Sequence, residues 1–140
     1  MFTFTVLIAS SAVSASESVP RKSFLADDPI SQATFASLRN KICAGTWQAK
    51  GLSGEITVRF FEKARKKARF LVQDGDKERR WWAYIRIKGT EVVLRASGFE
   101  RWDTYQLEEK AGVVTLSGSY DFEGKPRGTA ELTCTKKTQS

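Results

Sequence analysis

The residue types available for catalysis in this 140-residue chain are few. The chain has no histidine, which excludes Ser–His and Cys–His relays and every metal site that uses an imidazole ligand. Ser117 and Ser119 flank a glycine, and no base accompanies them in the sequence, so we expect both to be structural. Cys43 and Cys134 are the only cysteines.

Carboxylates are the remaining candidates for acid–base chemistry. A glycosidase-type pair needs two carboxyl groups at a defined separation across a cleft, which a small domain seldom offers. We therefore expect no catalytic residue, no metal and no cofactor. The acidic residues weighed for catalysis are Glu100, Asp103, Glu108 and Glu109, and those weighed as calcium ligands are Asp74, Asp76 and Glu78, in a segment that reads better as an Asp-Gly turn.

Basic and aromatic residues alternate in the middle of the chain. Cations interleaved with aromatic rings are typical of surfaces that bind single-stranded nucleic acid or sugars. The alternative is a solvated hairpin tip whose charges protect a sheet edge from aggregation. The candidate surface-binding residues are Lys63, Arg65, Lys66, Lys67, Arg69, Arg79, Arg80 and Trp82.

The first residues indicate export. Residues 2–13 are uncharged and largely apolar, and Val13-Ser14-Ala15 has the small-residue pattern of a signal-peptidase site. The run is too short to span a membrane. We predict a signal peptide over 1–15, a flexible tether over 16–27, a periplasmic or secreted location, and no stable membrane insertion after cleavage. The net charge of +7 favours anionic partners, such as an anionic polymer or protein.

An oxidising compartment makes Cys43 and Cys134 a predicted disulfide. Both lie on the apolar face of their predicted strands, the first and the last. These strands are neighbours in an eight-stranded barrel, so an inward pair could bond as the barrel closes.

The pattern after the leader predicts one domain: a helix over 28–42, a β-barrel over 43–136 and a short tail over 137–140. Asp28-Pro29 has the form of a helix start. From Cys43 the apolar period is two, which favours an eight-stranded antiparallel up-and-down barrel, or a tight sandwich. The predicted strands are Cys43–Ala49, Glu55–Phe61, Ala68–Gln73, Arg80–Ile87, Glu91–Ala96, Arg101–Leu107, Val113–Ser119 and Gly128–Thr135.

The facing of the sixth predicted strand stays open. Either Trp102, Thr104 and Gln106 point inward, or Arg101, Asp103, Tyr105 and Leu107 do. Both choices place polar atoms inside, which suggests a cavity rather than a dry core.

The Gly45-Thr46-Trp47 triplet on the first predicted strand, after a short helix, resembles the start of the lipocalin and wider calycin pattern. Leu116-Ser117-Gly118-Ser119-Tyr120 is similar to a strand of small exported lipocalin-like domains. The resemblance implies a barrel whose closed end is plugged by the tryptophan and whose interior holds a small ligand. The candidate lining residues are Trp47, Phe60, Phe70, Ile85, Trp102 and Tyr105.

We therefore expect an exported, non-enzymatic protein that holds an apolar or anionic small ligand inside a lipocalin-like barrel. The alternative is a binding or inhibitor module that grips an anionic polymer or a partner protein through its basic aromatic surface.

Overall fold

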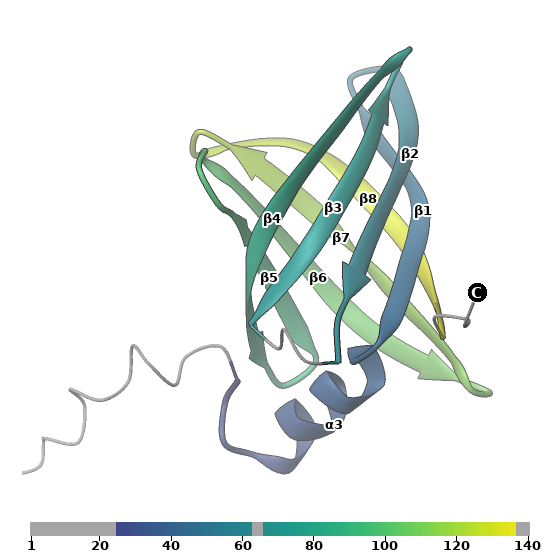
Figure 1. Ribbon diagram of the computed structural model, residues 1–140, viewed down its shortest axis with the longest axis vertical. Helices are drawn as coiled ribbons and strands as arrows, with labels where there is room; N and C mark the ends of the chain where they lie inside the picture. The colour runs from purple at the N-terminus through teal and green to yellow at the C-terminus, as the bar shows by residue number, and fades with distance from the viewer. Residues whose placement is uncertain (1–24, 63–65, 137–140) are drawn as a thin grey trace, which may run out of the picture.

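A computed structural model describes residues 25–62 and 66–136. Eight antiparallel strands form a closed barrel in sequence order, and the first strand pairs with the last (Figure 1). This confirms the predicted barrel over the sandwich. The elements are α3 (Pro29–Leu38), β1 (Lys41–Ala49), β2 (Leu52–Phe60), β3 (Lys67–Asp74), β4 (Lys77–Lys88), β5 (Glu91–Ala96), β6 (Arg101–Lys110), β7 (Val113–Phe122) and β8 (Lys125–Lys136).

The boundaries differ from the predicted ones mainly at the hairpins. β4 and β8 begin three residues before the predicted strands and include further charged residues, because a strand that continues past the core still pairs with its neighbour. The helix ends at Leu38 rather than near residue 42. Asn40 then adopts a positive φ of 62°, which turns the chain directly into β1.

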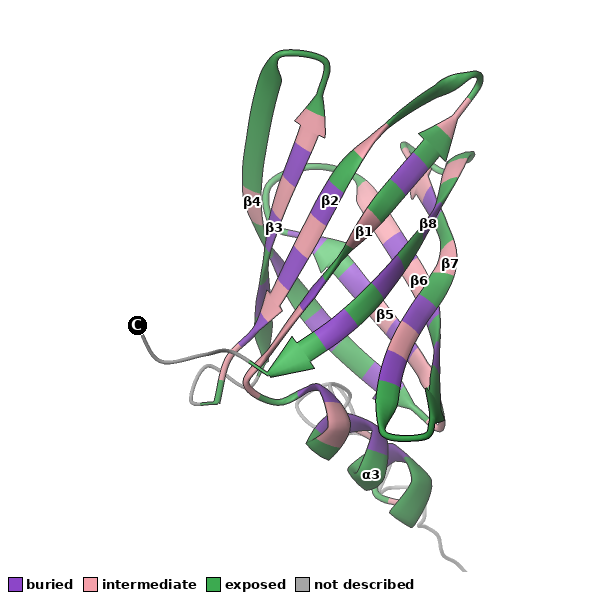
Figure 2. Ribbon diagram, turned by 90° about the vertical axis from the view of Figure 1, so that its right-hand side faces the viewer, coloured by how far each residue is buried: buried purple, intermediate pink, exposed green. Residues whose placement is uncertain are grey.

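Alternate residues of each strand point inward, as the burial pattern in Figure 2 shows. On β6, Asp103, Tyr105 and Leu107 point inward, as does Arg101 at the start of the strand. Trp102 lies on the outer face. The open alternative at the sixth strand is thereby decided.

The disulfide joins β1 to β8 where the barrel closes. Cys43 and Cys134 are directly opposite in the register of the two strands and are bonded through their sulfur atoms. Both side chains are buried. On the chain-entropy model, a cross-link over a separation of 91 residues stabilises the fold by about 4–5 kcal/mol.

One end of the barrel is covered by α3 (Figure 1). Asp28 caps the helix by accepting hydrogen bonds from Ser31 N at 2.8 Å and Ser31 Oγ at 2.9 Å. Ser31 Oγ accepts from Gly89 N at 2.6 Å, and Thr34 Oγ1 donates to Gly89 O at 2.7 Å. These bonds tie the helix to the β4–β5 turn.

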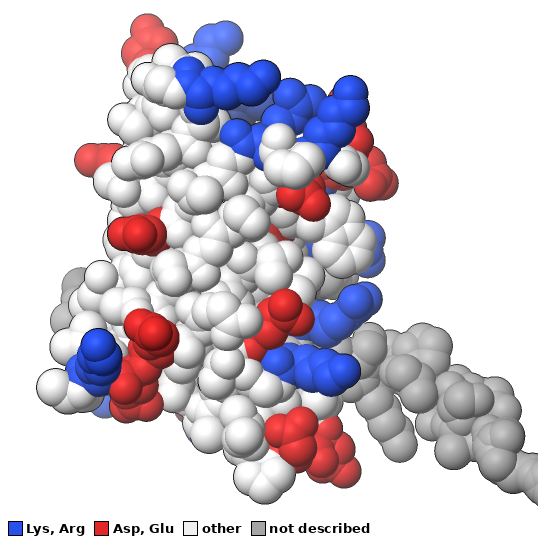
Figure 3. All heavy atoms as spheres, turned by 180° about the vertical axis from the view of Figure 1, so that it is seen from behind, with Lys and Arg blue, Asp and Glu red and all other residues white. Residues whose placement is uncertain are grey.

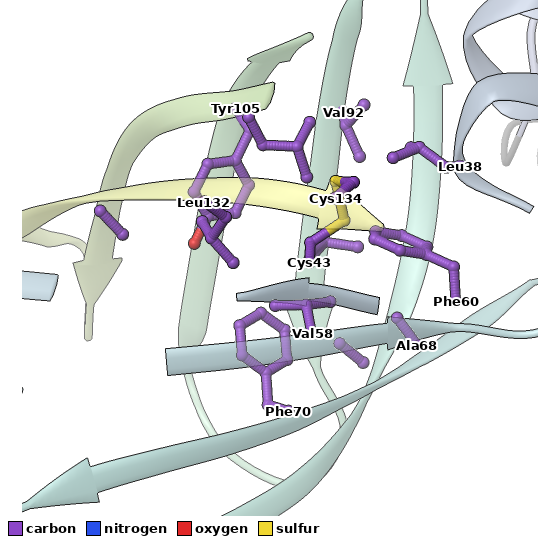
Figure 4. Packing of buried hydrophobic residues seen from close by; sticks show 14 of the residues in the cluster. Leu38, Cys43, Val58, Phe60, Ala68, Phe70, Val92, Tyr105, Leu132 and Cys134 are labelled. Carbon is purple, nitrogen blue, oxygen red and sulfur yellow. A yellow bond between two sulfur atoms is a disulfide. The ribbon is translucent and has the colours of Figure 1, made fainter. Parts of the chain in front are cut away.

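Apolar side chains fill the barrel beneath the helix. Leu38, Phe60 and Val92 lie around the Cys43–Cys134 bridge in Figure 4, and all are buried. Leu25 forms a bridge with Ile87, so the end of the segment predicted as a tether is attached to β4. The predicted signal peptide, most of the tether and the C-terminal tail lie outside the described residues.

Candidate functional site

The opposite end of the barrel is hollow. A pocket of about 860 Å³ opens between the hairpins that join β1 to β2, β3 to β4, β5 to β6 and β7 to β8. This volume lies within the range of small-molecule sites, about 300–1,000 Å³. Its lining residues are Trp47, Ala49, Lys50, Leu52, Val72, Asp74, Arg79, Arg80, Trp81, Phe99, Arg101, Tyr120, Phe122 and Arg127.

A chain of aromatic rings forms one side of this pocket. Trp81 stacks on Phe70 with ring centroids 4.9 Å apart and an interplanar angle of 15°. Phe99 meets Trp81 edge-on at 5.3 Å, and Phe122 follows at 6.3 Å from Phe99. The Trp81 indole N–H is buried and has no acceptor among the described residues. The wall therefore offers flat apolar surface to the pocket.

Trp47 forms the adjoining wall. Its Nε1 donates to Gln73 O on β3 at 2.9 Å, so the indole crosses the inner face of β2. Gly54 makes this crossing possible, because a Cβ at that position would lie 2.6 Å from Trp47 Nε1. The resemblance to lipocalins implied that this tryptophan plugs the closed end. Instead Trp47 lines the open pocket, six residues along β1 from the helix-covered end.

A buried ion pair lies below the rings. Arg101 Nε donates to Asp103 Oδ1 at 2.8 Å, and Arg101 Nη2 donates to Asp103 Oδ2 at 3.1 Å. Tyr105 Oη donates to the same Oδ2 at 2.8 Å. The Asp103 side chain is 1% exposed and that of Arg101 11%. The carboxylate therefore has three hydrogen bonds to offset its desolvation.

Burial and the neighbouring charges change the pKa values of this network. Burial acts to lower the pKa of Arg101, but the hydrogen bond and the charge of Asp103 outweigh it and raise that pKa. Burial, followed by the charge of Asp103, raises the pKa of Tyr105 well above its ordinary value. Arg101 therefore stays protonated and Tyr105 stays neutral at physiological pH.

The Arg101 guanidinium is surrounded by rings. It lies 4.0 Å from the ring centroid of Tyr120, 4.9 Å from that of Trp81 and 5.7 Å from that of Phe70. These contacts hold the planar cation at the floor of the pocket. Two of its N–H groups are engaged by Asp103, which leaves others of its five for a ligand.

The rim of the pocket carries an excess of positive charge. Arg101 is compensated by Asp103, and Arg80 pairs with Glu78 at 2.9 Å. Three other lining cations, Lys50, Arg79 and Arg127, face a single lining carboxylate, Asp74. In Figure 3 lysine and arginine side chains gather at this end of the molecule. The field at the mouth therefore favours an anion.

The structure brings only one of the predicted ligand-binding residues into the pocket lining. Trp47 lines it, whereas Phe70 and Tyr105 are fully buried, one behind the Trp81 ring and the other in the Asp103 network. Phe60 and Ile85 belong to the packed core. Trp102 is on the outer face and so does not line the interior.

The sequence interpretation missed most of the lining, notably Trp81, Phe99, Tyr120 and Phe122, and placed Arg101 inside only as one of two alternatives. Strand alternation carried part of the signal: Ala83, Ile85 and Ile87 point inward, so Trp81 and Arg79 had to do so as well.

The predicted surface-binding residues do not lie on one surface. Lys67, Arg69 and Trp82 are on the outer face of β3 and β4. Arg79 faces the pocket and Arg80 lies at its rim, while Lys66 is exposed just before β3. Lys63 and Arg65 lie outside the described residues.

Carboxylates do not gather into a site. Asp103 is buried against Arg101, whereas Glu108 and Glu109 are exposed on the lower part of β6. Asp74 and Asp76 flank Gly75, whose φ of 67° marks a tight hairpin turn. Within residues 25–62 and 66–136, no group of three or more acidic or cysteine side chains is placed to hold a metal ion.

No protein-family model matches this chain, and no curated protein matches it. In the part of the chain that the structure describes, none of the helices has the length and apolar character needed to cross a membrane. The closed eight-stranded barrel with a preceding helix is consistent with a lipocalin-like fold.

Proposed function

We propose that this protein is an exported, non-enzymatic carrier or sensor that holds a small amphipathic anion in the open end of its barrel. The pocket itself is the observation that carries the proposal, because it joins a wall of stacked aromatic rings to a rim with excess positive charge.

The aromatic side of the pocket and its positively charged rim suit different parts of one ligand. A planar or apolar body would lie against Trp81, Phe99 and Phe122. An acid group would reach Arg79 or Arg127 at the rim. The lining contains no serine, threonine or cysteine and only one carboxylate, which supports binding rather than a reaction. The disulfide supports an oxidising compartment.

A pair of fluorescent probes tests this assignment. 1-Anilinonaphthalene-8-sulfonate carries an aromatic body and an acid group, and N-phenyl-1-naphthylamine carries a similar body without the charge. We expect saturable binding of the sulfonate at one site. The double variant Arg79→Ala/Arg127→Ala should weaken the sulfonate about tenfold while binding of the neutral amine changes little, because only the charged contacts are lost.

Arg86→Ala is the matched control, because Arg86 lies on the outer face of the same strand as Arg79. It should leave both affinities unchanged. If the sulfonate shows no saturable site, or if the pocket and control variants weaken it equally, the proposal fails. If the proposal holds, native mass spectrometry of protein purified from its own host should show the natural ligand as extra bound mass.

A further inference from the structure

The outer surface of the barrel carries a second arrangement of rings and cations, separate from the pocket. Four aromatic side chains form it: Trp82 and Tyr84 on β4, Trp102 on β6 and Phe61, which follows β2. Trp82 and Tyr84 are 39% and 40% exposed, so part of each ring is accessible to a ligand. The Phe61 ring packs against that of Trp82, with the two centroids 5.6 Å apart.

Five cations lie over these rings. Arg69 lies 5.2 Å from the centroid of Trp82, and Lys67 and Arg95 lie 5.8 Å and 5.2 Å from that of Tyr84. The other two are Arg59, 4.6 Å from Phe61, and Arg86, 5.9 Å from Trp102. We call these four rings and five cations the basic aromatic wall.

Protection of a sheet edge does not account for this wall. The barrel is closed, so these strands have no free edge that charges would need to protect. Within the described residues, none of the five cations forms an ion pair with a carboxylate.

The opposite wall, formed by the outward residues of β7, β8 and β1, shows what a plain solvated surface looks like in this fold. It consists mostly of threonine, serine and other uncharged residues, and its middle is largely white in Figure 3.

The register of the strands places cations and rings in alternation. Lys67, Tyr84, Arg95 and Trp102 are consecutive partners across β3, β4, β5 and β6. With strands about 4.8 Å apart, this row extends about 14 Å. Trp82 is two residues from Tyr84 on β4, so the two exposed rings stand about 7 Å apart along the strand.

We propose that the basic aromatic wall binds single-stranded nucleic acid, with bases stacked on Trp82 and Tyr84 and phosphates held by the surrounding cations. Exposed rings on a sheet face, interleaved with cations, are how proteins bind unpaired bases without reading sequence. Four of the five cations are arginines, whose planar fork matches phosphate oxygens while it rests on an aromatic ring.

Fluorescence anisotropy with a labelled twelve-nucleotide oligothymidine measures this binding directly. Trp82→Ala/Tyr84→Ala keeps the net charge and should weaken the affinity at least tenfold, because stacked bases lose their platform. Both side chains are partly exposed, and thermal unfolding should confirm that the variant is folded.

A second pair of variants separates the wall from net charge. Arg69→Gln/Arg95→Gln removes two wall cations and should reduce the slope of log affinity against log salt by about 1.4. Lys110→Gln/Lys125→Gln removes two exposed cations elsewhere and should leave that slope nearly unchanged. Equal losses for the two pairs would overturn the proposal.

Two further results would also overturn it. One is oligothymidine binding by Trp82→Ala/Tyr84→Ala at the wild-type affinity. The other is tighter binding of heparin than of oligothymidine at matched salt, which would assign the wall to an acidic polysaccharide. Neither result would affect the probe-binding test of the pocket.

Discussion

The two ends of the barrel are built from the same eight strands but differ in how they are filled. Beneath α3, branched and aromatic side chains such as Leu38 and Phe60 interdigitate and exclude water. At the other end, large rings stand beside Arg79, Arg101 and Arg127, whose charges must be compensated or hydrated. The comparison teaches that charged side chains at inward positions prevent one half from packing like the other.

The largest expected effect comes from the closed end. Replacing both cysteines, in Cys43→Ala/Cys134→Ala, should lower the free energy of unfolding by about 4–5 kcal/mol, because the unfolded chain regains its freedom. Urea denaturation measures the loss. The fraction that remains folded should still bind the sulfonate probe, since the bridge is not part of the pocket lining. A loss of probe binding in the folded protein would show that the two ends are not independent.

The Arg101–Asp103 ion pair lies between the packed half and the hollow half, and breaking it should lower the free energy of unfolding almost as much. Asp103→Ala leaves Arg101 charged and unpaired at a side-chain exposure of 11%. Breaking a buried pair in this way costs about 3–5 kcal/mol. The control is Arg101→Met/Asp103→Leu, which removes both charges and should recover much of the stability measured by denaturation. If both variants are equally unstable, the two side chains stabilise the fold through their packing rather than through their charges.

Alkaline pH should lower the stability of the fold through Tyr105, which belongs to the same hydrogen-bonded network. Burial raises the pKa of Tyr105 well above the ordinary tyrosine value of 10.0. The folded state therefore holds this proton at a pH where the unfolded state has released it. Its contribution to stability is complete below about pH 10 and falls by up to about 1.4 kcal/mol per pH unit above it. Denaturation from pH 9 to 11 should show a steeper decline for the wild type than for Tyr105→Phe.

The smallest effect on stability should come from a ring at the open end that contacts the ligand. Phe99 is 39% exposed at the open end, so Phe99→Ala should change the free energy of unfolding by no more than about 1 kcal/mol. It should still weaken both naphthalene probes, because it removes part of the ring wall. Leu38→Ala, at 1% exposure, should do the reverse: destabilise the fold by about 2–5 kcal/mol and leave probe affinity unchanged.

The fold could be predicted from the sequence because its period is regular. Alternation placed Cys43 and Cys134 on inward faces of the first and last strands, and the structure confirms their disulfide. The Asp28-Pro29 helix start is also confirmed. Such signals are local, and each strand repeats them, so the sum is clear even where single residues are ambiguous.

The candidate site could be predicted only in part, because it depends on which face and which end a residue occupies. A one-residue choice on β6 exchanges Trp102 for Arg101 in the interior. The height of Trp47 along β1 decides whether it plugs the closed end or lines the mouth. Phe99 reaches the pocket from a connection between strands, where the period of two gives no direction.

The pairing of β1 with β8 also constrains how the chain reaches this structure. The seven hairpin pairings join segments that are adjacent in sequence, whereas the β1–β8 seam joins Lys41 to Lys136. The barrel therefore cannot close until the last strand is present. The entropic cost of bringing these two distant strands together falls on that closing step. Because Cys43 and Cys134 lie opposite each other in that seam, their bond fixes the register of the closing pair of strands once the barrel has formed.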